Sequence, residues 1–107
     1  MTESEYIQLA DALFRRLEHE IEAADLDYEL AAGGILEIEF DNGTRIIINR
    51  QTPMREIWVA ARSGGFHYRW QDGVWRDTRG DGELFVALSE MASGQAGRTV
   101  MLSGAPS

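Results

Sequence analysis

The spacing of apolar residues changes near Asp27, and this change constrains the fold more than any other feature of the sequence. Before it, apolar side chains recur every three to four residues, which is the period of an amphipathic helix. After it, apolar and polar residues alternate in short runs, which is the period of strands with one buried face. The order of the two patterns predicts a helix followed by a sheet.

A first helix is expected over residues 2–24. Its first residues, Thr-Glu-Ser-Glu, have the form of a capping box, with Thr2 at the N-cap and Glu5 three residues later. At 100° per residue, one face of this helix gathers apolar side chains and the opposite face carries a stripe of acids. The apolar face would consist of Tyr6, Leu9, Leu13, Leu17, Ile21 and Ala24, and the acidic stripe of Asp11, Glu18, Glu22 and Asp25. Glu20 falls close to the apolar side and does not fit the pattern.

Short runs of period two follow, and turn sequences separate them. Asp41-Asn42-Gly43 is a strong hairpin signal, because Asn-Gly supplies the positive φ that such turns require. Runs of this kind cover residues 26–30, 36–41, 44–49, 56–61, 66–70 and 74–77, with a break expected from Gln51. Tight turns join antiparallel strands, so the sequence predicts a meander of five or six strands.

A second helix is expected after this meander. Asp81 is its predicted N-cap, and one face would carry Leu84, Phe85, Leu88, Met91 and Ala92. The fold class is therefore α+β, a two-layer sandwich with two helices packed on one face of a five- to six-stranded antiparallel sheet. No linker divides the chain, so residues 1–107 are predicted to form one domain, with residues 103–107 frayed.

Alternation along the strands leaves a second face of the sheet in water. That face would carry Asp27, Glu29, Glu37, Glu39, Asp41, Asn49, Glu56, Trp58, His67 and Arg69. Trp58 is its informative member, because it shares its parity with Glu56 and not with the apolar Ile57 and Val59. A large aromatic side chain among charges is a candidate for partner recognition, since Trp is enriched at binding hot spots. A register slip of one residue would instead place Trp58 in the core.

Negative charge is concentrated in the N-terminal part of the chain. Residues 1–41 hold 12 acids and two arginines, a net charge of −10, whereas residues 42–107 carry a net charge of +2. The resulting total of −8 disfavours general nucleic-acid binding, which depends on neutralising phosphates. A basic protein surface or a cation is the natural complement to such an acidic segment.

Several classes of site are excluded or unsupported. The chain has no cysteine, which excludes disulfides, thiolate zinc sites and cysteine-ligated clusters. It shows neither a nucleophilic triad nor a Gly-rich phosphate loop. The apolar runs are too short to cross a bilayer, and without an export signal the cytoplasm is the expected location.

A dense group of carboxylates remains as the candidate functional site. It consists of Glu18, Glu22, Asp25, Asp27 and Glu29, continued by Glu37, Glu39 and Asp41. Oxygen ligands suit hard cations such as Mg²⁺, Ca²⁺, Mn²⁺ and iron. Because EF-hand spacing is absent, we expect weak binding of several cations, and the same acids would steer a basic protein surface toward the chain.

Residues 43–68, GTRIIINRQTPMREIWVAARSGGFHY, resemble the frataxin family, specifically its bacterial CyaY-type members. The specific matches are the Asn49-Arg50-Gln51-x-Pro53 run, the Ile57-Trp58-Val59-Ala60 run and the Gly65-Phe66-His67 run. The similarity extends from the acidic first helix through the second helix. The family fold, a two-helix layer on an antiparallel sheet, agrees with the fold expected from periodicity.

The resemblance implies a protein of iron–sulfur cluster assembly that binds Fe²⁺ and Fe³⁺ weakly and exchangeably, other divalent cations being possible. It implies association with a cysteine desulfurase and an iron–sulfur scaffold protein, and a regulatory instead of an enzymatic role. The implied iron ligands are Glu18, Glu22, Asp25, Asp27 and Glu29. The implied partner-binding residues are Asp11, Glu18, Glu22, Asp25, Asn49, Gln51 and Trp58.

The oligomeric state and two rival functions follow from the same reasoning. We expect a monomer, with iron-induced oligomers as an alternative. An iron-storage or ferroxidase protein is one rival function, and weak ferroxidase activity stays open. The other is an acidic protein-binding module for which metal is incidental.

Overall fold

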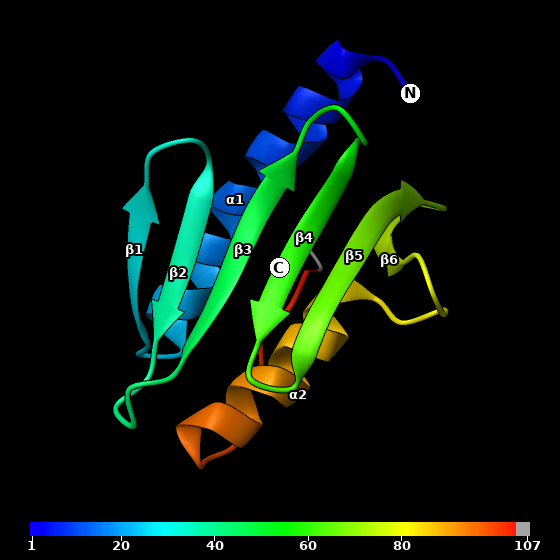
Figure 1. Ribbon diagram of the computed structural model, residues 1–107. Helices are drawn as coiled ribbons and strands as arrows, with labels where there is room; N and C mark the ends of the chain where they lie inside the picture. The colour runs from blue at the N-terminus through cyan, green and yellow to red at the C-terminus, as the bar shows by residue number, and fades with distance from the viewer. Residues whose placement is uncertain (105–107) are drawn as a thin grey trace.

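The computed structural model describes residues 1–104 and contains two helices and six strands (Figure 1). The helices are α1 (Glu3–Ala23) and α2 (Leu84–Ala96). The strands are β1 (Asp27–Ala31), β2 (Ile35–Glu39), β3 (Arg45–Gln51), β4 (Glu56–Ala61), β5 (Gly64–Gln71) and β6 (Val74–Asp77). They form one sheet in chain order, and every neighbouring pair is antiparallel. Both helices lie behind this sheet in Figure 1, which confirms the predicted two-layer α+β architecture.

The capping box predicted for α1 is present. The Thr2 hydroxyl accepts the Glu5 N–H at 3.1 Å, and the Glu5 carboxylate accepts the Thr2 N–H at 3.0 Å. Glu20, the misfit of the helix pattern, has a role of its own. It pairs with Arg16 at 3.1 Å and accepts the N–H of Ser103 at 2.7 Å, so it holds the segment after α2 against α1.

The N-cap predicted for α2 is wrong, because Glu83 and not Asp81 caps this helix. The Glu83 carboxylate accepts the N–H groups of Phe85 and Val86 at 2.8 and 3.2 Å. Glu83 also forms a β-bridge with Arg76, so the chain remains extended beyond Asp81 and the helix begins only at Leu84.

The core lies between the sheet and the two helices. Its largest fully buried side chains are Tyr6, Leu17, Ile21, Leu36, Ile38, Ile46, Ile48, Ile57, Val59, Tyr68, Leu84 and Leu88. Phe66 and Trp70 pack half-buried against this cluster. The hydroxyl of Tyr6 donates to the backbone oxygen of Glu56 at 2.7 Å, which ties α1 to the first residue of β4.

Three smaller details concern strand ends, the C-terminal segment and the membrane. β3 continues to Gln51, which pairs with Glu56, so the strand extends past the predicted break. Ser103, which the sequence predicts to be frayed, accepts a hydrogen bond from Arg16 at 2.8 Å, while residues 105–107 of that prediction lie outside the described residues. Within residues 1–104, neither helix has the length and apolar character needed to span a bilayer.

Two leucines, one buried and one exposed, provide a test of the described core. Leu17 is fully buried, so Leu17→Ala is expected to lower the free energy of unfolding by about 2–5 kcal/mol through a cavity. Leu30 on β1 is 57% exposed, and Leu30→Ala should change that free energy by no more than about 0.5 kcal/mol. Urea unfolding of both variants measures the difference, and equal losses would contradict the described core.

Candidate functional site

Glu18 and Glu22 of α1 meet at the hydroxyl of Tyr28 on β1, and we call these two acids the helix group. The hydroxyl donates to Glu22 Oε2 at 2.6 Å and to Glu18 Oε1 at 3.2 Å. The bond to Glu22, burial and the bond to Glu18 raise the pKa of Tyr28 well above its ordinary value, so the phenol remains a donor. Within residues 1–104 neither acid forms an ion pair, so their like charges, one helical turn apart, stay uncompensated.

Asp27 and Glu29 lie on the opposite face of β1 from Tyr28, because successive strand side chains alternate. Register places Asp27 opposite Glu39 and Glu29 opposite Glu37. We call these four acids the strand group. Like charges directly opposite each other on neighbouring strands are destabilising. Among the described residues, the ion pair that reaches this group is a long one, with Arg45 Nη1 3.9 Å from Glu37 Oε1.

Asp25 occupies the turn between α1 and β1, where its φ of 60° falls in the left-handed region. It lines a shallow hollow of about 260 Å³ together with Asp27, Glu39, Asp41 and Arg98. The C-terminal end of α2, where backbone carbonyls carry partial negative charge, also lines this hollow. Asp25 therefore shares its surroundings with the strand group.

Asp11 differs from the other acids of the predicted stripe, because an arginine already pairs with it. Arg50 Nη1 lies 2.6 Å from Asp11 Oδ1, and the Arg50 guanidinium lies over the ring of Phe14 with 4.5 Å to the centroid. The Asp11 side chain is 46% exposed, yet its charge is largely offset within the molecule.

The five acids proposed from the resemblance as iron ligands are thus divided by β1. Glu18 and Glu22 lie on the helix side, whereas Asp27 and Glu29 lie on the other face and Asp25 at the connecting turn. Within the described residues, no three His, Asp or Glu side chains gather closely enough to form a metal cage. The arrangement offers pairs of carboxylates facing water, which suits hydrated hard cations held by few protein ligands.

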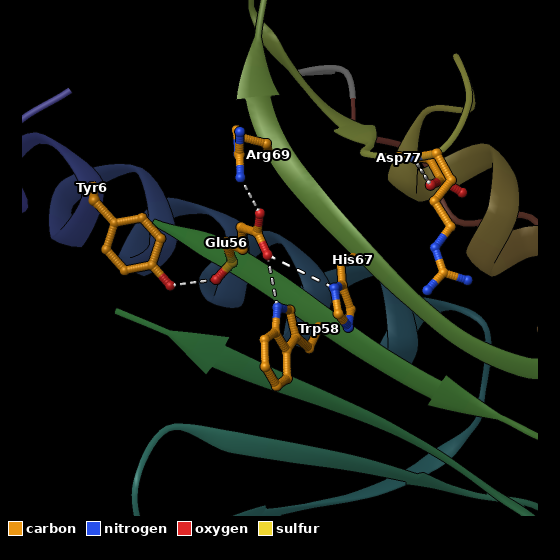
Figure 2. A network of polar contacts seen from close by, with 7 residues as sticks. Tyr6, Glu56, Trp58, His67, Arg69 and Asp77 are labelled. Atoms are coloured by element: carbon orange, nitrogen blue, oxygen red, sulfur yellow. Dashed lines mark hydrogen bonds and ion pairs between the residues drawn. The ribbon is translucent and has the colours of Figure 1, made fainter. Parts of the chain in front are cut away.

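Trp58 lies half-buried on the face of the sheet that no helix covers, as the alternation of β4 predicts. Register places Asn49 of β3 on one side of it and His67 of β5 on the other. The indole and the imidazole are stacked, with 4.3 Å between ring centroids and 9° between planes (Figure 2). Gln51, the other predicted partner residue of β3, lies on the same face beside Glu56.

Glu56 is the one residue of this face whose predicted exposure is wrong, because its side chain is buried. Trp58 Nε1 donates to Glu56 Oε1 at 2.9 Å and Arg69 Nη2 to Oε2 at 2.5 Å, while His67 Nδ1 lies 3.8 Å from Oε1 (Figure 2). Burial alone would raise the pKa of Glu56, but the two hydrogen bonds and the charge of Arg69 outweigh it and lower this pKa. Alternation places Glu56 beside Trp58, whereas the contact with Arg69 depends on the register of β4 and β5.

The family follows from the sequence comparison. Residues 1–98 match the family model of the frataxin-like domain. The chain belongs to the frataxin family. It is 52% identical over 104 residues to the iron-sulfur cluster assembly protein CyaY of Dechloromonas aromatica, covering 95% of this chain and 99% of that protein. It is 49% identical to the CyaY protein of Paraburkholderia phymatum, covering 96% of this chain and 99% of that one.

Solved frataxins share the architecture. Frataxin from Psychromonas ingrahamii superposes with a TM-score of 0.87 at 39% identity, over 96% of this chain and 99% of that one. A trimeric frataxin from the yeast Saccharomyces cerevisiae, complexed with ferrous iron, gives a TM-score of 0.65 at 29% identity, over 88% and 87% of the two chains. The predicted frataxin membership and fold are therefore confirmed.

The pairing of Glu56 predicts a pH dependence of stability in this frataxin. Because its folded-state pKa lies below the ordinary value of 4.5, the carboxylate stabilises the fold above that pH, and the stabilisation is lost as pH falls through the folded-state pKa. The difference in unfolding free energy between the unmodified chain and Glu56→Gln should therefore be larger at pH 7 than at pH 3. Urea unfolding at both pH values measures it, and a difference that grows toward acid would contradict the pairing.

Proposed function

We propose that this frataxin is an iron-binding regulator or adaptor of iron–sulfur cluster assembly, not itself an enzyme, that docks on a cysteine desulfurase by charge. The pathway is supported by relatives named iron-sulfur cluster assembly protein CyaY, about half identical over nearly the whole chain. One observation carries the docking proposal: the helix group and the strand group place like charges side by side in water. Such pairs destabilise a fold that has no cation or basic partner to meet them.

Iron is cargo in this proposal, held by the acids on either side of β1. Glu18 and Glu22 would act together, with the Tyr28 hydroxyl yielding its hydrogen bonds, while Asp25, Asp27 and Glu29 would act from the turn and the other face. Hard oxygen donors suit iron, and pairs of carboxylates favour weak, exchangeable binding. The ferrous complex of yeast frataxin supports iron as the metal.

The acids near β1 would meet the basic surface of the desulfurase, and Trp58 with Asn49 and Gln51 would contact the assembly it forms with the scaffold protein. Asp11 is the weakest member of the proposed docking set, because Arg50 already offsets its charge. We expect the frataxin to act as a monomer in the cytoplasm. Iron storage in oligomers remains the second candidate function, since the yeast relative complexed with ferrous iron is trimeric.

Titration with Fe²⁺ under anaerobic conditions tests the iron sites. Because Fe²⁺ is paramagnetic, backbone amide NMR signals of residues 18–29 should broaden before all others. The double variant Glu18→Gln and Glu22→Gln should abolish broadening around the helix group. Glu90→Gln, an exposed acid on α2, should leave the pattern unchanged. Broadening confined to other parts of the chain would overturn the iron proposal.

Charge reversal tests the docking surface. Glu18→Lys with Glu22→Lys should weaken binding to the cognate desulfurase by more than about tenfold, because within residues 1–104 no arginine offsets the charge of either acid. Asp81→Lys with Glu90→Lys makes the same change in net charge at two exposed acids away from β1, and should cost far less affinity. Binding is measured by pull-down and calorimetry, with thermal unfolding to verify that each variant folds.

The salt dependence of the same binding distinguishes charge from contact. Docking by the acids should weaken steeply as ionic strength rises, whereas a contact centred on Trp58 should weaken little. Equal affinities for the two charge-reversal variants would show that the acids near β1 are not the docking surface.

A further inference from the structure

We propose that Glu56 and Arg69 form a positioning pair that fixes the indole of Trp58 in the orientation used for partner contact. The inference rests on the proposed role of Trp58 in binding the desulfurase–scaffold assembly. The proposal adds Glu56 and Arg69, which alternation alone places on the solvent-facing side of the sheet without a specific role.

The stability that Glu56 contributes does not by itself explain why a carboxylate is buried at this position. Within residues 1–104 it is the one acid or base that is buried, with 3% of its surface exposed. Removing a carboxylate from water is costly, and apolar residues of similar size often stabilise such positions better than an ion pair does. Both carboxylate oxygens are occupied by side chains of the uncovered face, while the backbone oxygen accepts the Tyr6 hydroxyl. The carboxylate therefore acts on side chains of the uncovered face.

Two contacts determine where the indole lies. The hydrogen bond from Nε1 to Glu56 Oε1 fixes the rotation of the ring within its plane, and the stack on His67 fixes the plane itself (Figure 2). An aromatic side chain already fixed in its bound orientation loses little conformational freedom on association, which favours affinity. The indole is half-buried, so part of it stays available to a partner.

Arg69 holds the other end of the carboxylate. It comes from the neighbouring strand, directly opposite Glu56, and its side chain is 58% exposed. Without Arg69, Glu56 would lack its cation and would bind the indole less firmly. The pair therefore acts through Trp58 and does not itself need to touch the partner.

Indole NMR signals of the free protein give the first test. The chain has three tryptophans, so each variant reports Trp58 beside Trp70 and Trp75, and Trp58→Phe assigns the Trp58 signal. In Glu56→Gln one end of the side chain becomes an NH₂ donor, so the two ends can no longer accept separately from Trp58 and Arg69 as the two carboxylate oxygens do. The Trp58 Nε1–H signal should shift and exchange with water at least about tenfold faster, while the other two stay in place.

Two further variants complete this test. Arg69→Gln removes only an exposed side chain and should shift the same signal in the same way, so it carries the test if Glu56→Gln fails to fold. Glu90→Gln on α2 removes one negative charge, as Glu56→Gln does, and should shift no indole signal. An unchanged Trp58 signal in both Glu56→Gln and Arg69→Gln would overturn the proposal.

A double-mutant cycle gives the binding test, with the desulfurase–scaffold assembly as partner. Glu56→Gln should reduce affinity by about tenfold when Trp58 is present and by less than about twofold in the Trp58→Ala background, because the pair acts through the indole. Equal losses in both backgrounds would overturn the positioning role. If Trp58→Ala binds as tightly as the unmodified chain, the proposed role of Trp58 fails and the binding part of this inference fails with it. The indole signals still decide whether Glu56 fixes the ring.

Discussion

On each face of β1, carboxylates lie close enough to repel one another, and the rest of the structure has to overcome this repulsion. Glu29 faces Glu37 across neighbouring strands, and Glu18 and Glu22 converge on one hydroxyl. Folding brings these charges together, so it has to overcome their repulsion. The apolar core between the sheet and the two helices provides the stability that offsets this repulsion. Binding of a cation or a basic partner to these acids would therefore stabilise the fold further.

Some acids elsewhere in the molecule are paired with arginines, unlike most of the acids near β1. Asp11 is paired with Arg50, and Glu56 with Arg69, each at hydrogen-bond distance. The chain therefore has arginines able to neutralise acids, and it uses them on β3 and β5 but hardly at β1. The distribution separates acids that hold the structure in place from acids that remain available to cations and partners. Trp58, on the uncovered face of β4, donates to Glu56, an acid of the first kind.

Most of the fold could be predicted from the sequence, because its determinants are local. The capping box at Thr2, the Asn42-Gly43 turn and the two periods of the apolar pattern each act over a few residues. The side of the sheet on which Trp58 lies follows from the same alternation. The N-cap of α2 could not be predicted, because a bridge between Arg76 and Glu83 keeps the chain extended past Asp81. Likewise, the burial of Glu56 depends on a register that brings a distant arginine opposite it.

The site was predictable in composition but not in arrangement. Listing the acids of residues 18–29 does not reveal that β1 divides them, or that Tyr28 joins two of them, since both facts depend on which face of the strand meets α1. We expect the acids near β1 to oppose folding. Urea unfolding of Glu29→Gln at low ionic strength tests this expectation most directly, since this change removes one charge of a cross-strand pair. The variant should be more stable than the unmodified chain by about 0.2–1 kcal/mol, with the gain shrinking in salt. A variant that is less stable would contradict the account.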